Sequence, residues 1–181
     1  TQVIQRSSEF LRFLVSEELL AVEDIQKILS CARKGDSETK QAIFKVISDI
    51  VIHFKEPQSK FLINYILSLP KEQIDVEILE LLCDIIKYST KNKESISEVA
   101  NFLWELCTDE TQRELAEITL PKFSDLLKSW DLREIRGNYI NLSVELLKTS
   151  KAIKACLRII EKVLESYQKK ETQMDPYSQS D

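Results

Sequence analysis

Apolar residues recur at intervals of three and four along almost the whole chain, and no segment alternates cleanly between apolar and polar residues. The first spacing places apolar side chains on one face of an α-helix, whereas a half-buried strand needs strict alternation. The pattern therefore predicts about eight or nine helices joined by short polar loops. They are expected over about residues 7–15, 22–34, 37–54, 57–69, 75–88, 97–110, 110–130, 132–148 and 151–168.

Glycine, proline and acidic residues at a few positions predict how individual helices begin, bend or end. Gly35 follows the second helix and is expected as a left-handed C-cap, because glycine adopts positive φ without strain. Pro121 lies inside the seventh helix and is expected to kink or split it, since proline lacks an N–H group. Asp109 and Glu110 are expected to cap the start of the seventh helix. Gly137 is expected to weaken the first turns of the eighth.

The helix over 97–110 is apolar around much more than one face. Its two adjoining stripes cover roughly 200° at about 100° per residue, whereas a surface helix needs little over 100°. The stripes consist of Val99, Phe102, Leu103 and Leu106, and of Ala100, Trp104 and Cys107. Such helices must contact neighbours on two sides, as helical hairpins stacked in an array do.

Short loops make successive helices antiparallel, which a closed bundle and an open α-solenoid both satisfy. The broad apolar stripes favour the solenoid, and the prediction is an all-α fold of stacked antiparallel helical hairpins of the armadillo or HEAT type. No consensus recurs at a strict period, which argues against tetratricopeptide and ankyrin repeats. Residues 1–168 are expected to form the repeat segment and 169–181 a disordered tail or linker.

Composition supports the all-α prediction and narrows the partners. The 181 residues include only 2 Gly and 4 Pro, fewer than turn-rich β folds need. The net charge is −5 and no basic stripe is present, so nucleic acid is not an expected partner. No apolar run is long enough to cross a membrane. Because the chain begins with Thr1, it is expected to be a segment of a longer protein.

Cys107 is the first candidate for chemistry. A catalytic thiolate needs a histidine to accept its proton, and the only histidine, His53, lies on another predicted helix, four residues after Asp49. Cys107 is near a helix C-terminus, where the partial negative charge disfavours a thiolate. We therefore interpret Cys107 as a packing residue and expect no catalytic residue in the chain. His53 is interpreted as a partly exposed helix residue.

No metal or cofactor site is expected either. Cys31, Cys83, Cys107 and Cys156 form no C-x-x-C pair, so a zinc site is not indicated, and reduced thiols of the cytosol or nucleus are expected. Two isolated glycines cannot form a phosphate-binding loop.

Three further groups of charged or aromatic residues are considered as binding sites. The acidic pair Glu17–Glu18 is interpreted as a solvated helix end. The segment KYSTKNK, with Lys87, Lys91 and Lys93, is either a site for an acidic partner or a solvated loop, and the solvated loop is favoured. The third group consists of aromatic residues at stripe edges or helix ends, which fit partner contacts and core packing equally well. They are Tyr65, Tyr88, Tyr139 and Trp130.

Five stretches, in order, carry a family resemblance. They are EFLRFLVSEELLAVEDIQKI, KQAIFKVISDIVIHF, VANFLWELCTDE, AEITLPKFSDLL and LSVELLKTSKAIKACLRIIEKVLESY. Over about residues 8 to 168 the chain resembles the helical region upstream of the catalytic domain in very large ubiquitin-specific proteases of the fat-facets type. The resemblance rests on ordered apolar and small polar patterns, and the catalytic cysteine and histidine boxes of those enzymes have no match here.

The resemblance implies an armadillo-like scaffold segment of a cytosolic cysteine-type deubiquitinase that engages protein partners, including ubiquitinated substrates, with its active site in another domain. No catalytic residue is carried over to this chain. The alternative is a HEAT or armadillo module of an unrelated large scaffold or transport factor. A free-standing enzyme that uses Cys107 is a more distant alternative.

Overall fold

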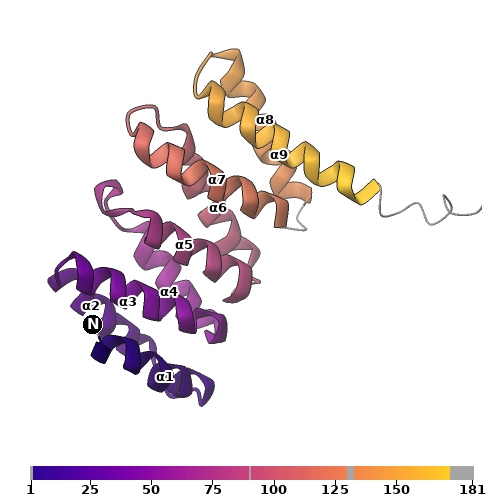
Figure 1. The fold of residues 1–181 in the computed structure, drawn as a ribbon. Coiled ribbons are helices and arrows are strands. Elements are labelled where there is room, and N and C mark those ends of the chain that lie inside the picture. The colour runs from indigo at the N-terminus through magenta and orange to yellow at the C-terminus, as the bar shows by residue number, and fades with distance from the viewer. Residues whose placement is uncertain (1, 90, 130–132, 172–181) are drawn as a thin grey trace, which may run out of the picture. The chain divides into compact units, whose positions relative to one another are not determined.

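The computed structural model describes residues 2–89, 91–129 and 133–171, and this part of the chain is helical without any strand (Figure 1). The α-helices are α1 (Gln2–Ser16), α2 (Val22–Lys34), α3 (Ser37–Ile50), α4 (Glu56–Leu67), α5 (Val76–Asp84), α6 (Lys93–Thr108), α7 (Arg113–Ser129), α8 (Arg133–Lys148) and α9 (Ile153–Glu171). Two short 3₁₀ turns, η1 (Val51–His53) and η2 (Lys71–Gln73), and one π-helical turn, η3 (Ile85–Ser89), complete the described elements.

The chain forms two compact units, residues 1–100 and 101–181, whose boundary falls inside α6. In the first unit, α1, α3 and α5 pack side by side in one layer, and α2 packs against α4 in a second layer. In the second unit, α7 packs against α9, and α8 packs against α9 from the other layer. Inside each unit, helices two places apart in the sequence therefore pack side by side, as α1 with α3, α3 with α5, α2 with α4 and α7 with α9 do, which is how stacked helical hairpins are arranged.

Polar contacts between stacked helices recur at a nearly constant distance along the sequence. In the first unit, Lys40 Nζ on α3 donates to Asp75 Oδ2 at the start of α5 over 2.7 Å, across a separation of 35 residues. In the second unit, Lys154 Nζ on α9 donates to Glu117 Oε1 on α7 over 2.8 Å, across 37 residues. A structural repeat of this length thus exists although no sequence consensus marks it.

The predicted broad stripes of α6 are confirmed by burial. Val99, Ala100 and Leu103 are fully buried, and Cys107 is 4% exposed. Trp104 is half-buried. Apolar side chains from both stripes are therefore covered, as a helix with neighbours on two sides requires.

Several predicted helix starts and ends are wrong: the first helix begins at Gln2 rather than at 7, and the third is α-helical only to Ile50 and continues as η1. Side-chain hydrogen bonds explain two further cases. The sixth helix begins at Lys93 rather than at 97, because the Asn92 side chain accepts hydrogen bonds from the N–H groups of Glu94 and Ser95. The seventh begins at Arg113, since the Asp109 carboxylate binds Thr111 and forms a turn before it. The helix over 75–88 is α-helical only to Asp84 and continues as η3.

Two expectations about individual residues also need correction. Gly35 ends α2 but has φ −79° and ψ 167°, so it is extended rather than left-handed. A Cβ at Gly35 would lie 2.7 Å from Thr39 Cγ2, so close packing explains this glycine. Pro121 does not split α7, which runs unbroken through it. The final helix reaches Glu171, and residues 172–181 of the predicted tail lie outside the described part.

Candidate protein-interaction surface

Cys107 lies where the packing interpretation predicts. It is the last but one residue of α6 and is almost wholly buried, with its edge on a small cavity of about 290 Å³ beside the start of α9. His53 is exposed on η1 in the first unit. Cys83 and Cys156 are also buried and Cys31 is exposed, and no disulfide occurs in the described part of the chain. Burial raises the pKa of the Cys156 thiol, which keeps it protonated.

Tyr139 belongs to the core of the second unit rather than to a binding surface. It is 1% exposed, and its hydroxyl donates to Asn101 Oδ1 over 2.7 Å. Its ring lies 5.5 Å from the Trp104 ring and meets the Phe123 ring edge-on at 5.1 Å. Burial, with a smaller effect of the nearby Glu105 carboxylate, raises the pKa of Tyr139. This cluster joins α6, α7 and α8, and it accounts for one of the four aromatic residues that could have contacted a partner.

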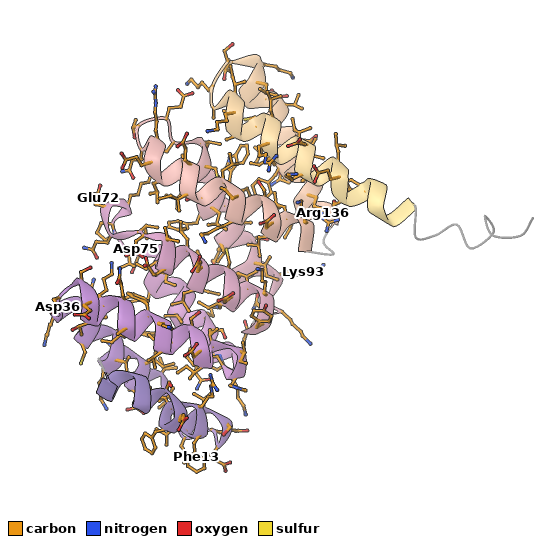
Figure 2. All side chains as sticks on the ribbon, in the orientation of Figure 1. Phe13, Asp36, Glu72, Asp75, Lys93 and Arg136 are labelled. Carbon is orange, nitrogen blue, oxygen red and sulfur yellow. The ribbon has the colours of Figure 1, made fainter. Side chains whose placement is uncertain are left out.

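Arg136 is a structural residue that the sequence interpretation missed. It is only 3% exposed, and its guanidinium donates from Nε to the Leu127 carbonyl over 2.8 Å and from Nη2 to the Lys128 carbonyl over 2.9 Å (Arg136 is labelled in Figure 2). Those carbonyls are at the C-terminal end of α7, where acceptors lack helical donors and the helix dipole is negative. The Tyr167 ring lies 6.0 Å from the guanidinium. An arginine in the first turn of a predicted helix was the available signal.

The remaining aromatic and acidic candidates have separate surroundings. Tyr65 is half-buried beneath the Arg33 guanidinium, 5.6 Å from its ring centroid, whereas Tyr88 is 61% exposed. Glu18 forms an ion pair with Lys55 over 2.5 Å instead of being only solvated. Trp130 lies outside the described residues.

Glu110 has a different structural role from the predicted one. Its carboxylate does not cap α7 but accepts the N–H of Ala152 over 2.7 Å, directly before α9. Ala152 and Ser150 both have positive φ, at 46° and 56°, so the loop between α8 and α9 makes a tight, non-glycine turn. Glu110 therefore stabilises the start of α9, which forms one wall of the groove described next.

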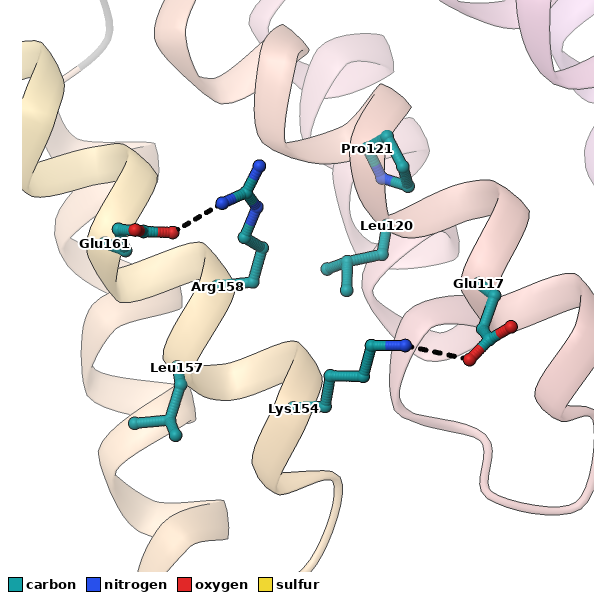
Figure 3. A pocket seen from close by; sticks show the side chains of 7 residues that line it. All are labelled: Glu117, Leu120, Pro121, Lys154, Leu157, Arg158 and Glu161. Atoms are coloured by element: carbon teal, nitrogen blue, oxygen red, sulfur yellow. Dashed lines mark hydrogen bonds and ion pairs between the residues drawn. The ribbon is translucent and has the colours of Figure 1, made fainter.

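A groove of about 620 Å³ runs between α7 and α9 in the second unit (Figure 3). Its apolar lining consists of Leu120, Pro121 and Leu157. Leu157 is 55% exposed, although it is a large apolar side chain. Pro121 has no N–H to donate to the main-chain carbonyl four residues before it, so α7 lacks one helical hydrogen bond at this point. The groove thus offers an apolar surface.

Two ion pairs border the apolar lining. Lys154 reaches from α9 to Glu117 on α7, and Arg158 donates to Glu161 over 2.7 Å on α9 itself (Figure 3). The Lys154 ammonium lowers the pKa of Glu117 by hydrogen bonding to the carboxylate. The border holds two cations and two carboxylates, so its charges are balanced.

The exposed apolar surface continues along α9. Ile153, Leu157 and Leu164 are all about half exposed. Their spacings of four and seven residues place them on one face of the helix. An apolar stripe of this kind is covered when another helix or a partner segment packs on it.

Two further features are absent from the described residues. These residues contain no group of three histidine, cysteine, aspartate or glutamate side chains that could hold a metal ion. Within the same residues, none of the helices combines the length and the apolar character needed to cross a membrane.

Comparison with known families gives a match that covers the whole chain. Residues 1–181 match the family described as the UBP24/USP9X/USP9Y ARM repeat. A comparison with curated proteins finds no match. The family match confirms the resemblance to large ubiquitin-specific proteases. Together with the helix pairing inside each unit, it also confirms the all-α, armadillo-like fold class.

Proposed function

The chain belongs to the UBP24/USP9X/USP9Y ARM repeat family, and we propose on that premise that it is a non-catalytic scaffold segment of a large cysteine-type deubiquitinase. In this proposal the segment holds protein partners, including ubiquitinated substrates, while ubiquitin is cleaved in another domain of the parent protein. The proposed place of action is the cytosol or the nucleus.

The observation that carries the binding role is the groove between α7 and α9. Large apolar side chains are normally covered in a folded domain, yet Leu157 is exposed between two ordered ion pairs. A partner that inserts an apolar side chain beside Leu120 and Pro121 would remove this surface from water. Anchors of this kind contribute most of the binding energy at protein interfaces.

The experiment introduces Leu157→Asp into the parent protein and follows two activities. Cleavage of a minimal fluorogenic ubiquitin substrate should be unchanged, because the groove takes no part in the chemistry. Removal of ubiquitin from purified ubiquitinated proteins should slow by about tenfold, the cost of losing one good apolar anchor. Phe10→Asp is the matched control, since Phe10 is a similarly exposed apolar residue on α1.

Two results would contradict the proposal. An equal loss of both activities would place the groove in the catalytic machinery, and no loss of either would remove it from substrate engagement. The non-catalytic part is tested separately with an electrophilic ubiquitin probe on the isolated 181-residue chain. Covalent labelling of any cysteine by that probe would show that the segment has its own active thiol.

A further inference from the structure

A second surface, in the first unit, is cationic and aromatic. We define it as the lysine–tyrosine patch, consisting of Lys87, Tyr88, Lys91 and Lys93 together with Ile52. Lys87 and Tyr88 are in the π-helical turn η3, and Lys91 and Lys93 follow where α6 begins (Lys93 is labelled in Figure 2). A π-helical turn is rare in proteins and is often found at functional sites.

The lysines of the patch are available for a partner. All three are exposed, and none forms an ion pair with any side chain that the structure describes. In contrast, lysines elsewhere in the molecule form ion pairs between helices or between successive turns of one helix, as Lys40 does with Asp75. Three exposed lysines without a carboxylate among them are unusual in a chain whose net charge is −5.

Two carboxylates of α5, which packs against η3, make their hydrogen bonds to α3. On α5, the Asp84 carboxylate accepts a hydrogen bond from Ser48 over 3.0 Å, and the Glu77 carboxylate faces Gln41. The turn η1 packs directly against η3 and contributes Ile52, which is 52% exposed, and the exposed His53. An apolar side chain and an exposed tyrosine therefore accompany the lysines.

Lys91 and Lys93 also lie at the N-terminal end of α6, where positive charge is unfavourable. They precede and begin α6, and the N-terminus of a helix carries partial positive charge. Negative charge supplied by a partner would relieve this repulsion. The patch therefore gains more from a carboxylate-rich ligand than an equal number of lysines placed elsewhere would.

We propose that the lysine–tyrosine patch binds an acidic segment of a partner protein in which a large apolar side chain stands between carboxylates. The carboxylates pair with the lysines, and the apolar side chain covers Tyr88 and Ile52. A protein segment fits better than nucleic acid or an anionic membrane, because the net negative charge of the chain repels long polyanions. The proposed scaffold function supplies one part of this proposal, namely that the partner is a protein. The α7–α9 groove has no part in it.

The test measures fluorescence anisotropy of a short fluorescein-labelled peptide rich in glutamate, with two central leucines, as the 181-residue chain is added. The triple variant Lys87→Glu, Lys91→Glu, Lys93→Glu should weaken the affinity by about tenfold or more and remove most of its salt dependence. Tyr88→Ser should weaken the affinity severalfold while the salt dependence stays, because it removes only apolar contact.

The control is a second triple variant, Lys34→Glu, Arg113→Glu and Lys151→Glu. It produces the same net charge from exposed cations outside the patch, and it should bind the peptide almost as the natural chain does. Equal loss in both triple variants, or no loss in either, would overturn the proposal. Tighter binding of single-stranded RNA or of phosphatidylserine vesicles than of the peptide would also overturn it, without bearing on the groove experiment.

Discussion

The protonation of Tyr139 is linked to folding, because its side chain is buried. Its pKa is raised in the folded chain, whereas in the unfolded chain it is about 10. Below that pH both states keep the proton, and the buried hydroxyl contributes its full stabilisation. As the pH rises above about 10, only the unfolded state loses its proton readily, so the free energy of unfolding falls.

Tyr139→Phe separates these effects. At neutral pH it should lower the free energy of unfolding by about 1 kcal/mol, since the hydrogen bond to Asn101 is lost. This deficit should shrink and then reverse above about pH 10, as urea titrations at several pH values would show. Tyr88→Phe, at an exposed position, should change stability by less than about 0.5 kcal/mol throughout. A deficit that does not depend on pH would contradict this linkage.

At the residue scale, the sequence predicted burial well and specific hydrogen bonds poorly. The burial of Cys107 beside Trp104 follows from helical periodicity, because spacing determines which residues share a face. The role of Arg136 does not, since its acceptors are main-chain carbonyls at the end of another helix. The groove residues share this difficulty: Leu120 and Leu157 have the same sequence pattern, yet only packing in three dimensions leaves Leu157 exposed.

At the scale of elements, the two glycines should respond oppositely to the same substitution. Gly35→Ala would place a Cβ against Thr39, whose backbone N–H is already held by the Asp36 cap. It should lower the unfolding free energy by about 1–2 kcal/mol. Gly137 is inside α8 with nothing within 4 Å of a new Cβ, so Gly137→Ala should raise it by about 1 kcal/mol. Thermal and urea unfolding measure both, and equal signs would refute the packing explanation for Gly35.

The elements themselves were predictable, whereas their ends were less so. Every predicted helix corresponds to an α-helix in the described part of the chain, because each has its own run of apolar residues at helical spacing. The ends depend on local side-chain bonds, such as that of Asn92, and on packing that turns the end of α5 into η3. The lysine–tyrosine patch follows one such end, whereas the α7–α9 groove lies within two helices and depends on how they pack.

At the scale of the whole molecule, stability should be distributed by repeat rather than shared equally. In stacked repeats each hairpin contacts only its neighbours, so a local defect weakens nearby helices most. The division of the chain into two compact units, with the boundary inside α6, favours this behaviour. Such a molecule can lose order at one binding surface and keep it at another.

Arg136→Met provides the test, because it keeps much of the side-chain volume but leaves the Leu127 and Lys128 carbonyls without their buried donor. We expect a loss of about 2–4 kcal/mol in the second unit. Hydrogen exchange followed by mass spectrometry should show faster exchange in α7, α8 and α9, with little change in α2 and α3. Arg136→Lys should be intermediate, since it keeps the charge but not the two-pronged geometry. Equally accelerated exchange in all helices would instead show that the chain unfolds as one cooperative body.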